Sequence, residues 1–288
     1  MSTRYPIIAV TGSSGAGTTT TGQIFGKIFD DEGIRAAFVN GDSFHKYTRE
    51  QMAKLAAKGH HGEKNHFSLE ANHIDKLDAL FQDYGATGTG QFRHYVHDDD
   101  RALIAAGYKP GTFTSWSTLP SKTDLLFYEG LHGGVVNEQH NIAQHVDLLI
   151  GVVPIVNLEW IQKIHRDTVY RGYSHTLVVE TIIKRMDDYV RDIVPQFAHT
   201  DINFQRVPIV DTSNPFAMKE VPLDHESMVV IYFRKHQDVN FPYLLHMIQG
   251  AFISRHDTLV IPGHKMPLAI DLIIRPMILE MLAHKSFT

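Results

Sequence analysis

Short apolar runs separated by turn residues recur along the chain and predict a sheet connected by helices. Residues 5–11 form an apolar, β-branched run that is typical of a strand buried on both faces. From position 19 apolar residues recur at helical spacing until Gly33, which indicates a helix. Residues 36–40 then predict a second strand. The chain therefore opens as strand, helix and strand, with its loops at one edge of the sheet.

Five later apolar runs complete the predicted sheet, at residues 125–128, 147–156, 207–210, 228–233 and 258–261. Helical spacing returns over residues 178–193, where Pro195 closes the pattern, and over residues 268–282, with a kink expected at Pro276. These elements predict an α/β fold, a mixed and mainly parallel sheet flanked by helices.

Residues 85–120 interrupt the pattern with a stretch rich in Gly, Thr, Pro, His and Asp. Loops of this length are usually functional, so we expect an excursion at the edge of the active site. With 288 residues, 43% of them hydrophobic, the chain can bury a large core, and we expect residues 1–288 to form a single domain.

Composition narrows the possible functions. The net charge of -5 gives no broad basic surface, so neither nucleic acid nor an anionic membrane is expected as a partner. The chain has no cysteine, which excludes disulfides, thiolate metal sites and thiol switches. It has no apolar run near the ~20 residues of a membrane helix, and its first residues lack an export signal. We therefore expect a cytoplasmic protein.

A glycine-rich turn follows the first strand and opens the first helix. It consists of Gly12, Ser13, Ser14, Gly15, Ala16, Gly17, Thr18 and Thr19. In such a turn backbone N–H groups surround phosphates and the helix N-terminus favours anions, so we expect ATP to bind here. Thr18 stands where phosphate loops usually have lysine. Either the turn binds no triphosphate, or a cation arrives from elsewhere in the chain.

Two acidic residues stand at predicted strand ends, where ligands of open α/β sheets bind. Asp42 follows residues 36–40, and Glu129 follows residues 125–128. Phosphoryl transfer to a hydroxyl needs a base on the acceptor and oxygen ligands for Mg²⁺. We assign the base to Asp42, and we expect Thr19, Asp42 and Glu129 to face the metal. A turn-capping role is the alternative for both carboxylates.

Basic residues follow in two groups. His45 and Arg49 lie four residues apart, so a helix would place both on one face, where they could clamp a phosphate on the acceptor. The second group, around residues 160–175, contains Lys163, His165, Arg166, Asp167 and Arg171. As a closing lid it would bring Lys163 and Arg166 to the transferred phosphoryl in place of the missing loop lysine. Solvated helical faces are the alternative for both groups.

Six blocks together resemble the proteobacterial type of phosphoribulokinase: GSSGAGTT, GDSFH, YVHD, FYEGLHG, NLEWIQKIHRD and DTSNPF. The resemblance extends over nearly the whole chain, and the blocks are long and ordered. It implies a P-loop NTPase-type fold similar to nucleoside monophosphate kinases. It also implies an ATP- and Mg²⁺-dependent transfer to the C1 hydroxyl of ribulose 5-phosphate, in a homo-oligomer.

The resemblance also implies residue roles. Asp42 matches the family's base and Glu129 its acidic strand-end residue. The sugar-phosphate contacts match His45, Arg49 and Arg171, and the lid motif essential to transfer matches Lys163, Arg166 and Asp167. Tyr95 and His97 lie in the block tied to acceptor binding. Bacterial members are often activated by NADH between subunits; Arg234 and Arg255 fall in that region, but Tyr232 replaces an expected arginine.

Other functions remain open from the sequence. A phosphoribulokinase-like enzyme could use another phosphorylated sugar or small molecule as its acceptor. Kinases for uridine or pantothenate are disfavoured because they keep the loop lysine and need no clamp for an acceptor phosphate. A nucleotide-sensing regulator without turnover is disfavoured because Asp42 and Lys163 are both intact.

Overall fold

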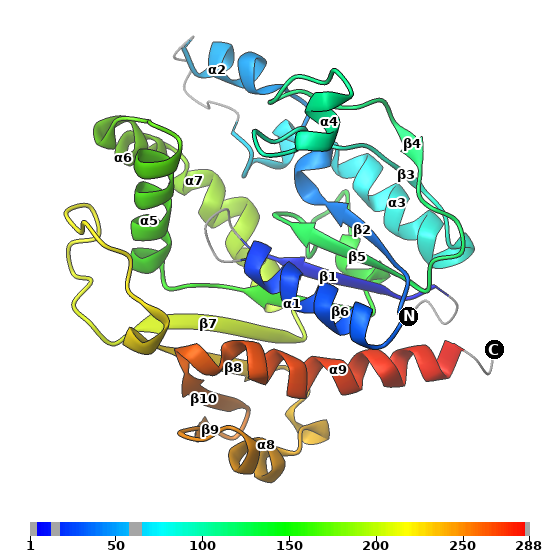
Figure 1. Ribbon diagram of the computed structural model, residues 1–288, viewed down its shortest axis with the longest axis vertical. Helices are drawn as coiled ribbons and strands as arrows, with labels where there is room; N and C mark the ends of the chain where they lie inside the picture. The colour runs from blue at the N-terminus through cyan, green and yellow to red at the C-terminus, as the bar shows by residue number, and fades with distance from the viewer. Residues whose placement is uncertain (1–4, 13–17, 58–64, 286–288) are drawn as a thin grey trace.

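The computed structural model describes residues 5–12, 18–57 and 65–285. Its centre is an eight-stranded sheet in the order β2-β5-β1-β6-β7-β8-β10-β9 (Figure 1). The pairs from β2 to β7 are parallel, and those from β7 to β9 are antiparallel. The strands are β1 (Ile7–Thr11), β2 (Ala36–Asn40), β5 (Leu125–Gly130), β6 (Leu148–Val152), β7 (Ile202–Pro208), β8 (Ser227–Phe233), β9 (Phe252–Arg255) and β10 (Thr258–Pro262). The predicted mixed, mainly parallel sheet is confirmed.

Helices cover both faces of this sheet. The helices of the described residues are α1 (Thr18–Asp31), α2 (Arg49–Ala57), α3 (Ile74–Thr87), α4 (Arg101–Ala105), α5 (Val156–His165), α6 (His175–Lys184), α7 (Met186–Asp188), α8 (Phe241–Met247) and α9 (Met266–Lys285). Of these, α1 and α9 lie on one face and α3 lies on the other. Two π-helical turns, Arg166–Tyr170 and Tyr189–Ile193, continue α5 and α7. Of the helices in the described ranges, none is both long and apolar enough to cross a membrane.

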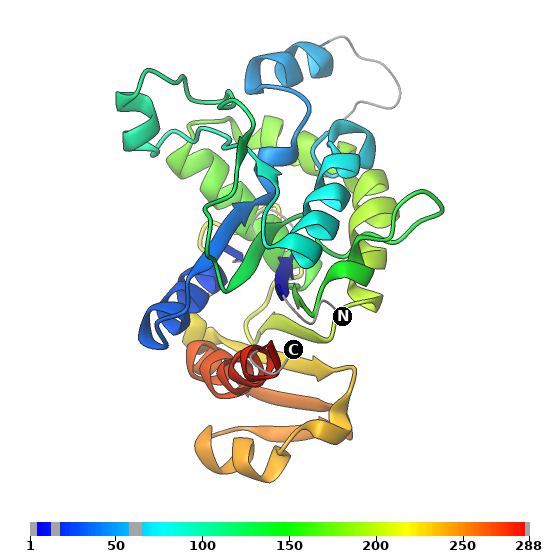
Figure 2. The same cartoon turned by 90° about the vertical axis from the view of Figure 1, so that its right-hand side faces the viewer.

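Alternation along the central strands divides the core into two layers. One set of side chains, such as Ile8 and Val10 of β1, packs with α1 and α9. The opposite set, such as Ile7 and Ala9, packs with α3. Because β1 is covered on both sides, all five of its residues are buried, as the continuous apolar run predicts. Figure 2 shows α9 in red against one side of the sheet.

Two strands differ from the prediction. The run at residues 207–210 lies at the end of β7, which begins at Ile202. Only Ile202 and Phe204 face the buried cluster while the other residues of the strand are half-exposed, so this strand lacks a continuous apolar run. The edge strand β9 was missed, because all of its residues are exposed and no buried face marks it.

The stretch at residues 85–120 is more structured than an irregular excursion. Its first residues end α3, which Gly88 caps in the left-handed conformation with φ 72°. It then carries the two-stranded ladder of β3 (Gln91–Phe92) and β4 (Ser117–Thr118), with α4 between them. Near the other end of the chain, α9 continues through Pro276.

Candidate active site

The carboxyl ends of the parallel strands bring the two predicted acids to one edge of the sheet. Glu129 in β5 pairs with Asn40 of β2 and Val10 of β1. Asp42 follows β2 in the 3₁₀ turn Gly41–Phe44, where its N–H donates to the Asn40 side chain at 2.8 Å. The sheet therefore places both carboxylates where ligands of α/β folds bind.

Two glycines allow the chain after β2 to pass close to the end of β5. A Cβ on Gly41 would lie 2.5 Å from the Tyr128 hydroxyl and 2.8 Å from the Gly130 Cα. A Cβ on Gly130 would lie 2.6 Å from the same hydroxyl. Only glycine fits both positions without displacing the backbone that carries Asp42.

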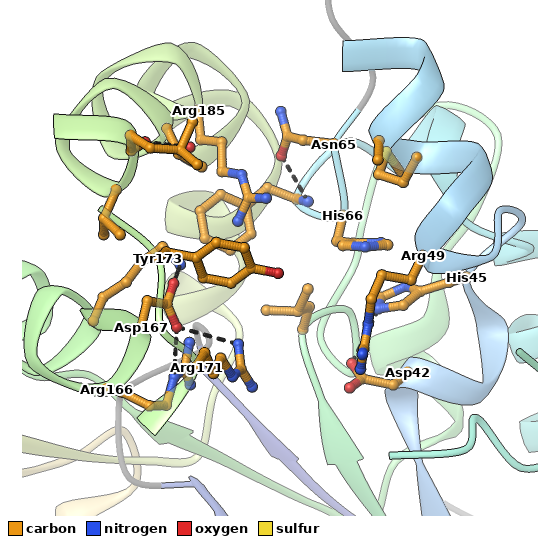
Figure 3. A pocket seen from close by; sticks show the side chains of 18 of the residues that line it. Asp42, His45, Arg49, Asn65, His66, Arg166, Asp167, Arg171, Tyr173 and Arg185 are labelled. Carbon is orange, nitrogen blue, oxygen red and sulfur yellow. Dashed lines mark hydrogen bonds and ion pairs between the residues drawn. The ribbon is translucent and has the colours of Figure 1, made fainter. Parts of the chain in front are cut away.

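A cavity of about 870 Å³ opens beside these strand ends (Figure 3). Its walls come from the segment after β2, the excursion, and the region from α5 to α7. Its lining contains six basic side chains and three carboxylates: Arg49, Lys163, Arg166, Arg171, Lys184 and Arg185, with Asp42, Asp98 and Asp167. The excess of positive charge favours an anionic ligand.

Asp42 lies between two imidazoles. The Nε2 atoms of His45 and His97 are 3.1 Å and 3.5 Å from its carboxylate oxygens. Burial acts to raise the pKa of Asp42, but His45, His97 and the nearby His66 outweigh burial and lower this pKa below its usual value. The carboxyl is therefore ionised at neutral pH, as a group that accepts a proton must be.

His45 is fixed beside Asp42 by contacts on several sides. Its Nδ1 lies 2.7 Å from Asn72 Oδ1. The Asn72 amide nitrogen donates to the carbonyls of His66 and Ser68 at 3.0 Å and 2.7 Å, which turns its oxygen toward His45. The His45 and His66 rings stack with centroids 3.8 Å apart. Both ring nitrogens of His45 thus have partners within the protein.

The expected helical pairing of His45 with Arg49 was wrong. His45 closes the 3₁₀ turn with extended backbone at ψ 138°, and α2 begins only at Arg49. The chain at His45 instead forms a β-bridge with Asn72, which diverts the backbone from a helical path. Both side chains nevertheless line the cavity.

The excursion supplies the wall next to Arg49. Its guanidinium makes two hydrogen bonds to Asp98, at 2.9 Å and 3.0 Å, and these bonds raise the pKa of Arg49. Gly111, with φ 81°, passes so close that a Cβ there would lie 2.7 Å from the Arg49 Cβ. Tyr95 and His97, with rings 4.9 Å apart, also line this wall.

Three predicted cations surround Asp167 on the opposite wall. Its carboxylate is 2.5 Å from Lys163 Nζ, 3.2 Å from Arg166 Nε and 3.2 Å from an Arg171 guanidinium nitrogen. Burial lowers the pKa of Lys163 to about 8, although Asp167 opposes the shift. Burial acts to raise the pKa of Asp167, but Lys163 and the two arginines lower it overall. The cluster is charged and already ordered at the cavity.

Most of the predicted phosphate loop falls outside the described residues, namely Ser13, Ser14, Gly15, Ala16 and Gly17. Before it, Gly12 N–H donates to the Gly130 carbonyl at 3.2 Å. After it, α1 begins at Thr18 and includes Thr19, whose side chains are not described. The strand before these residues and the helix after them agree with the predicted order of elements.

The described acids suit a hard cation. A Cβ on Gly22 of α1 would lie 2.7 Å from Glu129 Oε2, so this carboxylate lies against the helix that the glycine turn opens. Carboxylate oxygens of Glu129 and Asp42 are ligands that Mg²⁺ prefers, and Mg²⁺ commonly completes its shell with waters and phosphate oxygens. Among the described residues, no group of three ligating acids or histidines gathers.

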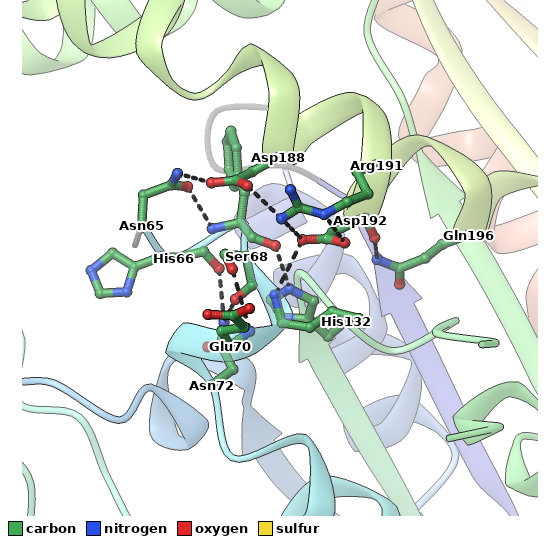
Figure 4. A network of polar contacts seen from close by, with 12 residues as sticks. Asn65, His66, Ser68, Glu70, Asn72, His132, Asp188, Arg191, Asp192 and Gln196 are labelled. Atoms are coloured by element: carbon green, nitrogen blue, oxygen red, sulfur yellow. Dashed lines mark hydrogen bonds and ion pairs between the residues drawn. The ribbon is translucent and has the colours of Figure 1, made fainter. Parts of the chain in front are cut away.

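A network of polar contacts that no sequence motif predicted supports this cavity (Figure 4). Gln196 is only 2% exposed. Its amide nitrogen donates to the carbonyls of Leu131 and Asp192 at 2.9 Å and 2.8 Å, and its oxygen accepts from Gly134 N–H at 3.0 Å. It ties the loop after β5 to the helical region that follows α7.

Several cavity residues were also missed: Asn65, His66, Tyr173, Lys184 and Arg185. They come from two segments that meet only in the fold, and no local motif marks them. The predicted effector residues lie elsewhere, since neither Arg234 nor Arg255 lines the cavity. Arg234 forms an ion pair with Asp201, and Arg255 is exposed on β9.

Comparison with known proteins agrees with the geometry. The model of the phosphoribulokinase / uridine kinase family matches residues 7–213. The chain is 54% identical to a phosphoribulokinase of Sinorhizobium medicae and to a chromosomal phosphoribulokinase of Cupriavidus necator, over 99% of each chain. A solved phosphoribulokinase from Rhodobacter spheroides is 48% identical, covers 99% of both chains and superposes with a TM-score of 0.89, which confirms the predicted P-loop fold. The chain therefore belongs to the phosphoribulokinase / uridine kinase family.

Proposed function

We propose that this protein transfers the γ-phosphoryl group of ATP to the C1 hydroxyl of ribulose 5-phosphate, giving ribulose 1,5-bisphosphate and ADP. One observation carries the proposal: an ionised Asp42 and the cations around Asp167 face the same cavity. Relatives named phosphoribulokinase, matched over almost their full length, supply the choice of acceptor. We expect residues 1–288 to form a single domain. We also expect the protein to act in the cytoplasm.

In this reaction Asp42 accepts the proton of the acceptor hydroxyl, whose oxygen forms a bond to the γ-phosphorus. The bond between that phosphorus and the β–γ bridging oxygen breaks, and ADP leaves with the electron pair. Lys163 and Arg166 stabilise the charge on the transferred group, and Asp167 orients them. These two cations replace the lysine that the loop lacks at Thr18.

The glycine turn from Gly12 to Thr19 would hold the ATP phosphates through its backbone. Mg²⁺, held by Thr19, Glu129 and Asp42 directly or through water, would neutralise charge between the β- and γ-phosphates. Segment 160–175 would act as the lid. On the acceptor side we assign contacts to His45, Arg49, Tyr95, His97 and Arg171, all of which line the cavity.

Self-association is part of the proposal. The family resemblance implies a homo-oligomer with NADH as a regulator in some members. We assign Arg234 and Arg255 to such an effector site, in which Tyr232 on β8 replaces an expected arginine.

The test is to incubate the purified protein with ATP, Mg²⁺ and a panel of phosphorylated sugars, and to measure ADP release. Rapid release that depends on ribulose 5-phosphate is expected; release with another sugar alone would contradict the choice of acceptor.

Asp42→Asn should lower kcat by ~10²-fold or more, because a positioned base contributes this much. Its ATP affinity should change little, and unchanged turnover would remove Asp42 from the role of base.

A further inference from the structure

The backbone carbonyls of the turn that carries Asp42 need partners, because the chain becomes extended where the turn ends at His45. The carbonyl of Asp42 accepts from the N–H of His45 at 3.2 Å, and that of Phe44 accepts from the N–H of His73 at 2.7 Å. The carbonyls of Ser43 and His45 remain, and both residues are buried. A buried carbonyl without a partner is costly, so these two carbonyls require a donor from elsewhere in the chain.

One guanidinium of the excursion supplies both donors. Arg93 Nε donates to the Ser43 carbonyl at 2.8 Å, and Arg93 Nη2 donates to the His45 carbonyl at 2.6 Å. These two nitrogens form one edge of a planar group, so the pair of bonds fixes the spacing of the two carbonyls. Arg93 is not among the described residues that line the cavity. Its connection to the site is therefore through the turn.

Aromatic rings of the excursion hold this guanidinium in place. The Arg93 Cζ lies 3.7 Å from the centroid of the Phe113 ring and 4.7 Å from the centroid of the Trp116 ring. Burial lowers the pKa of Arg93, and cation–π contacts offset the cost of burying its charge. Trp116 also packs against Phe44 of the turn, with ring centroids 5.7 Å apart. The turn is thus bound to an ordered part of the excursion.

Alternate residues of the same segment reach the turn again. Side chains at alternate positions of an extended chain share a face, and Arg93, Tyr95 and His97 occupy such positions. The Tyr95 ring lies 6.2 Å from the His45 ring. The Nε2 atom of His97 lies 3.5 Å from the Asp42 carboxylate. The excursion therefore contacts the backbone of the turn and both of its functional side chains.

We propose that Arg93 is a positioning residue for the base. By bridging two carbonyls it fixes the turn, so that the Asp42 carboxylate points at the acceptor hydroxyl during phosphoryl transfer. The inference rests on the proposed function and deepens it, because it gives the excursion a part in catalysis beyond that of a cavity wall. The His45 ring is held separately by Asn72 and His66. Loss of Arg93 should therefore disturb the direction of Asp42 more than the binding of the acceptor.

The experiment compares Arg93→Ala, Arg93→Lys and the control Arg206→Ala in steady-state assays. Arg93→Ala is expected to lower kcat by about 10- to 100-fold, because a displaced base loses the geometry needed for attack. KM for ATP and KM for ribulose 5-phosphate should change less than about 3-fold. Arg93→Lys should give an intermediate kcat, since one ammonium nitrogen replaces the two-nitrogen edge.

Arg206 on β7 is a matched control, because it is also a half-buried arginine that binds a backbone carbonyl. It donates to the Pro222 carbonyl at 2.6 Å and to the Ser227 hydroxyl at 3.2 Å, and it is not among the described residues that line the cavity. Arg206→Ala should lower the melting temperature and keep the native kcat. If Arg93→Ala behaves in the same way, its role is structural alone and the inference is overturned.

A double-mutant cycle with Asp42→Asn shows whether Arg93 acts through the base. In the Asp42→Asn background, Arg93→Ala should lower the residual kcat by less than about 3-fold, because there is no base left to position. A loss as large as in the native background would overturn the inference, and so would a rise in KM for ribulose 5-phosphate that exceeds the fall in kcat. If Arg93→Ala does not fold, a native kcat in Arg93→Lys decides against the inference. Failure of the proposed function is distinct, since the native protein would then release no ADP with ribulose 5-phosphate.

Discussion

At the scale of single residues, Lys163 links burial to the pH dependence of the reaction. Its side chain is 10% exposed, and burial lowers its pKa from the usual 10.5 to about 8. The ammonium form is present below this pH and is lost as the pH rises through about 8. Because the positive charge is needed at the transferred phosphoryl, we expect kcat/KM to fall above pH 8.

Lys163→Arg tests this assignment, because a guanidinium stays charged throughout the range. The alkaline fall should move upward by more than one pH unit, even if the rate at neutral pH is reduced. Asp42→Asn, measured with enough enzyme to detect its residual rate, is the control and should retain the fall near pH 8. A native profile that is flat from pH 7 to 10 would exclude Lys163 as the ionising group.

Some residues of the site could be predicted from the sequence and others could not. Asp42 and Glu129 could be found because they follow apolar runs that end at one sheet edge. Lys163 could be found because basic residues cluster near it in the chain. Gln196 and Arg185 could not, because their partners or surroundings lie far away in sequence and the local composition is ordinary.

At the scale of elements, two glycines of α1 should respond differently to the same substitution. A Cβ on Gly26 would have no neighbour within 4 Å. Gly26→Ala should therefore stabilise the protein by roughly 0.5–1 kcal/mol, through the higher helix propensity of alanine. Thermal unfolding should show the gain, with activity unchanged.

Gly22→Ala is the matched variant one turn earlier. Its Cβ would lie 2.7 Å from Glu129 Oε2 and would push this carboxylate away. Because the end of a side chain can move, little stability should be lost, but the Mg²⁺ concentration needed for half-maximal activity should rise several-fold. If both variants show the same Mg²⁺ dependence as the native protein, Glu129 does not serve the metal.

Strands were predictable where a short apolar run marks them. β1 and β2 were found from such runs, and β8 from residues 228–233. β7 was misplaced because polar residues alternate with its buried Ile202 and Phe204, and β9 was missed because it has no buried face. The helix expected through His45 and Arg49 failed because a long-range bridge to Asn72 competes with local helical geometry.

At the scale of the whole molecule, the two halves of the sheet have different surroundings. The parallel half carries the site at its carboxyl ends, with helices on both faces. In the antiparallel half, one face packs against α9. The opposite face, here called the open face, carries Met228, Val230, Tyr232, Phe252 and the buried Val260, which the strand pairing places side by side. None of these five residues belongs to a described buried cluster.

The open face suits a second copy of this chain. Tyr232 is 39% exposed and Phe252 is 50% exposed, although both lie among apolar neighbours. These five residues are uncharged, and Arg255 lies at the margin of the same face, opposite Thr258, which pairs with Tyr232. Burial of the apolar area between two copies would stabilise the contact.

Phe252→Glu should disrupt this association, because each copy would bury a carboxylate without a partner in the contact. Sedimentation velocity at micromolar concentration should show an oligomer for the native protein and a smaller species for the variant. Ile104→Glu adds the same charge at an exposed position on α4, at the other end of the molecule in Figure 1, and should leave the assembly intact. A native monomer, or a Phe252→Glu variant that assembles as the native protein does, would show that the open face does not join copies. Phe252 is exposed in the single chain, so at high dilution the Phe252→Glu variant should have nearly the same melting temperature as the native protein. This measurement distinguishes a loss of assembly from a loss of folding.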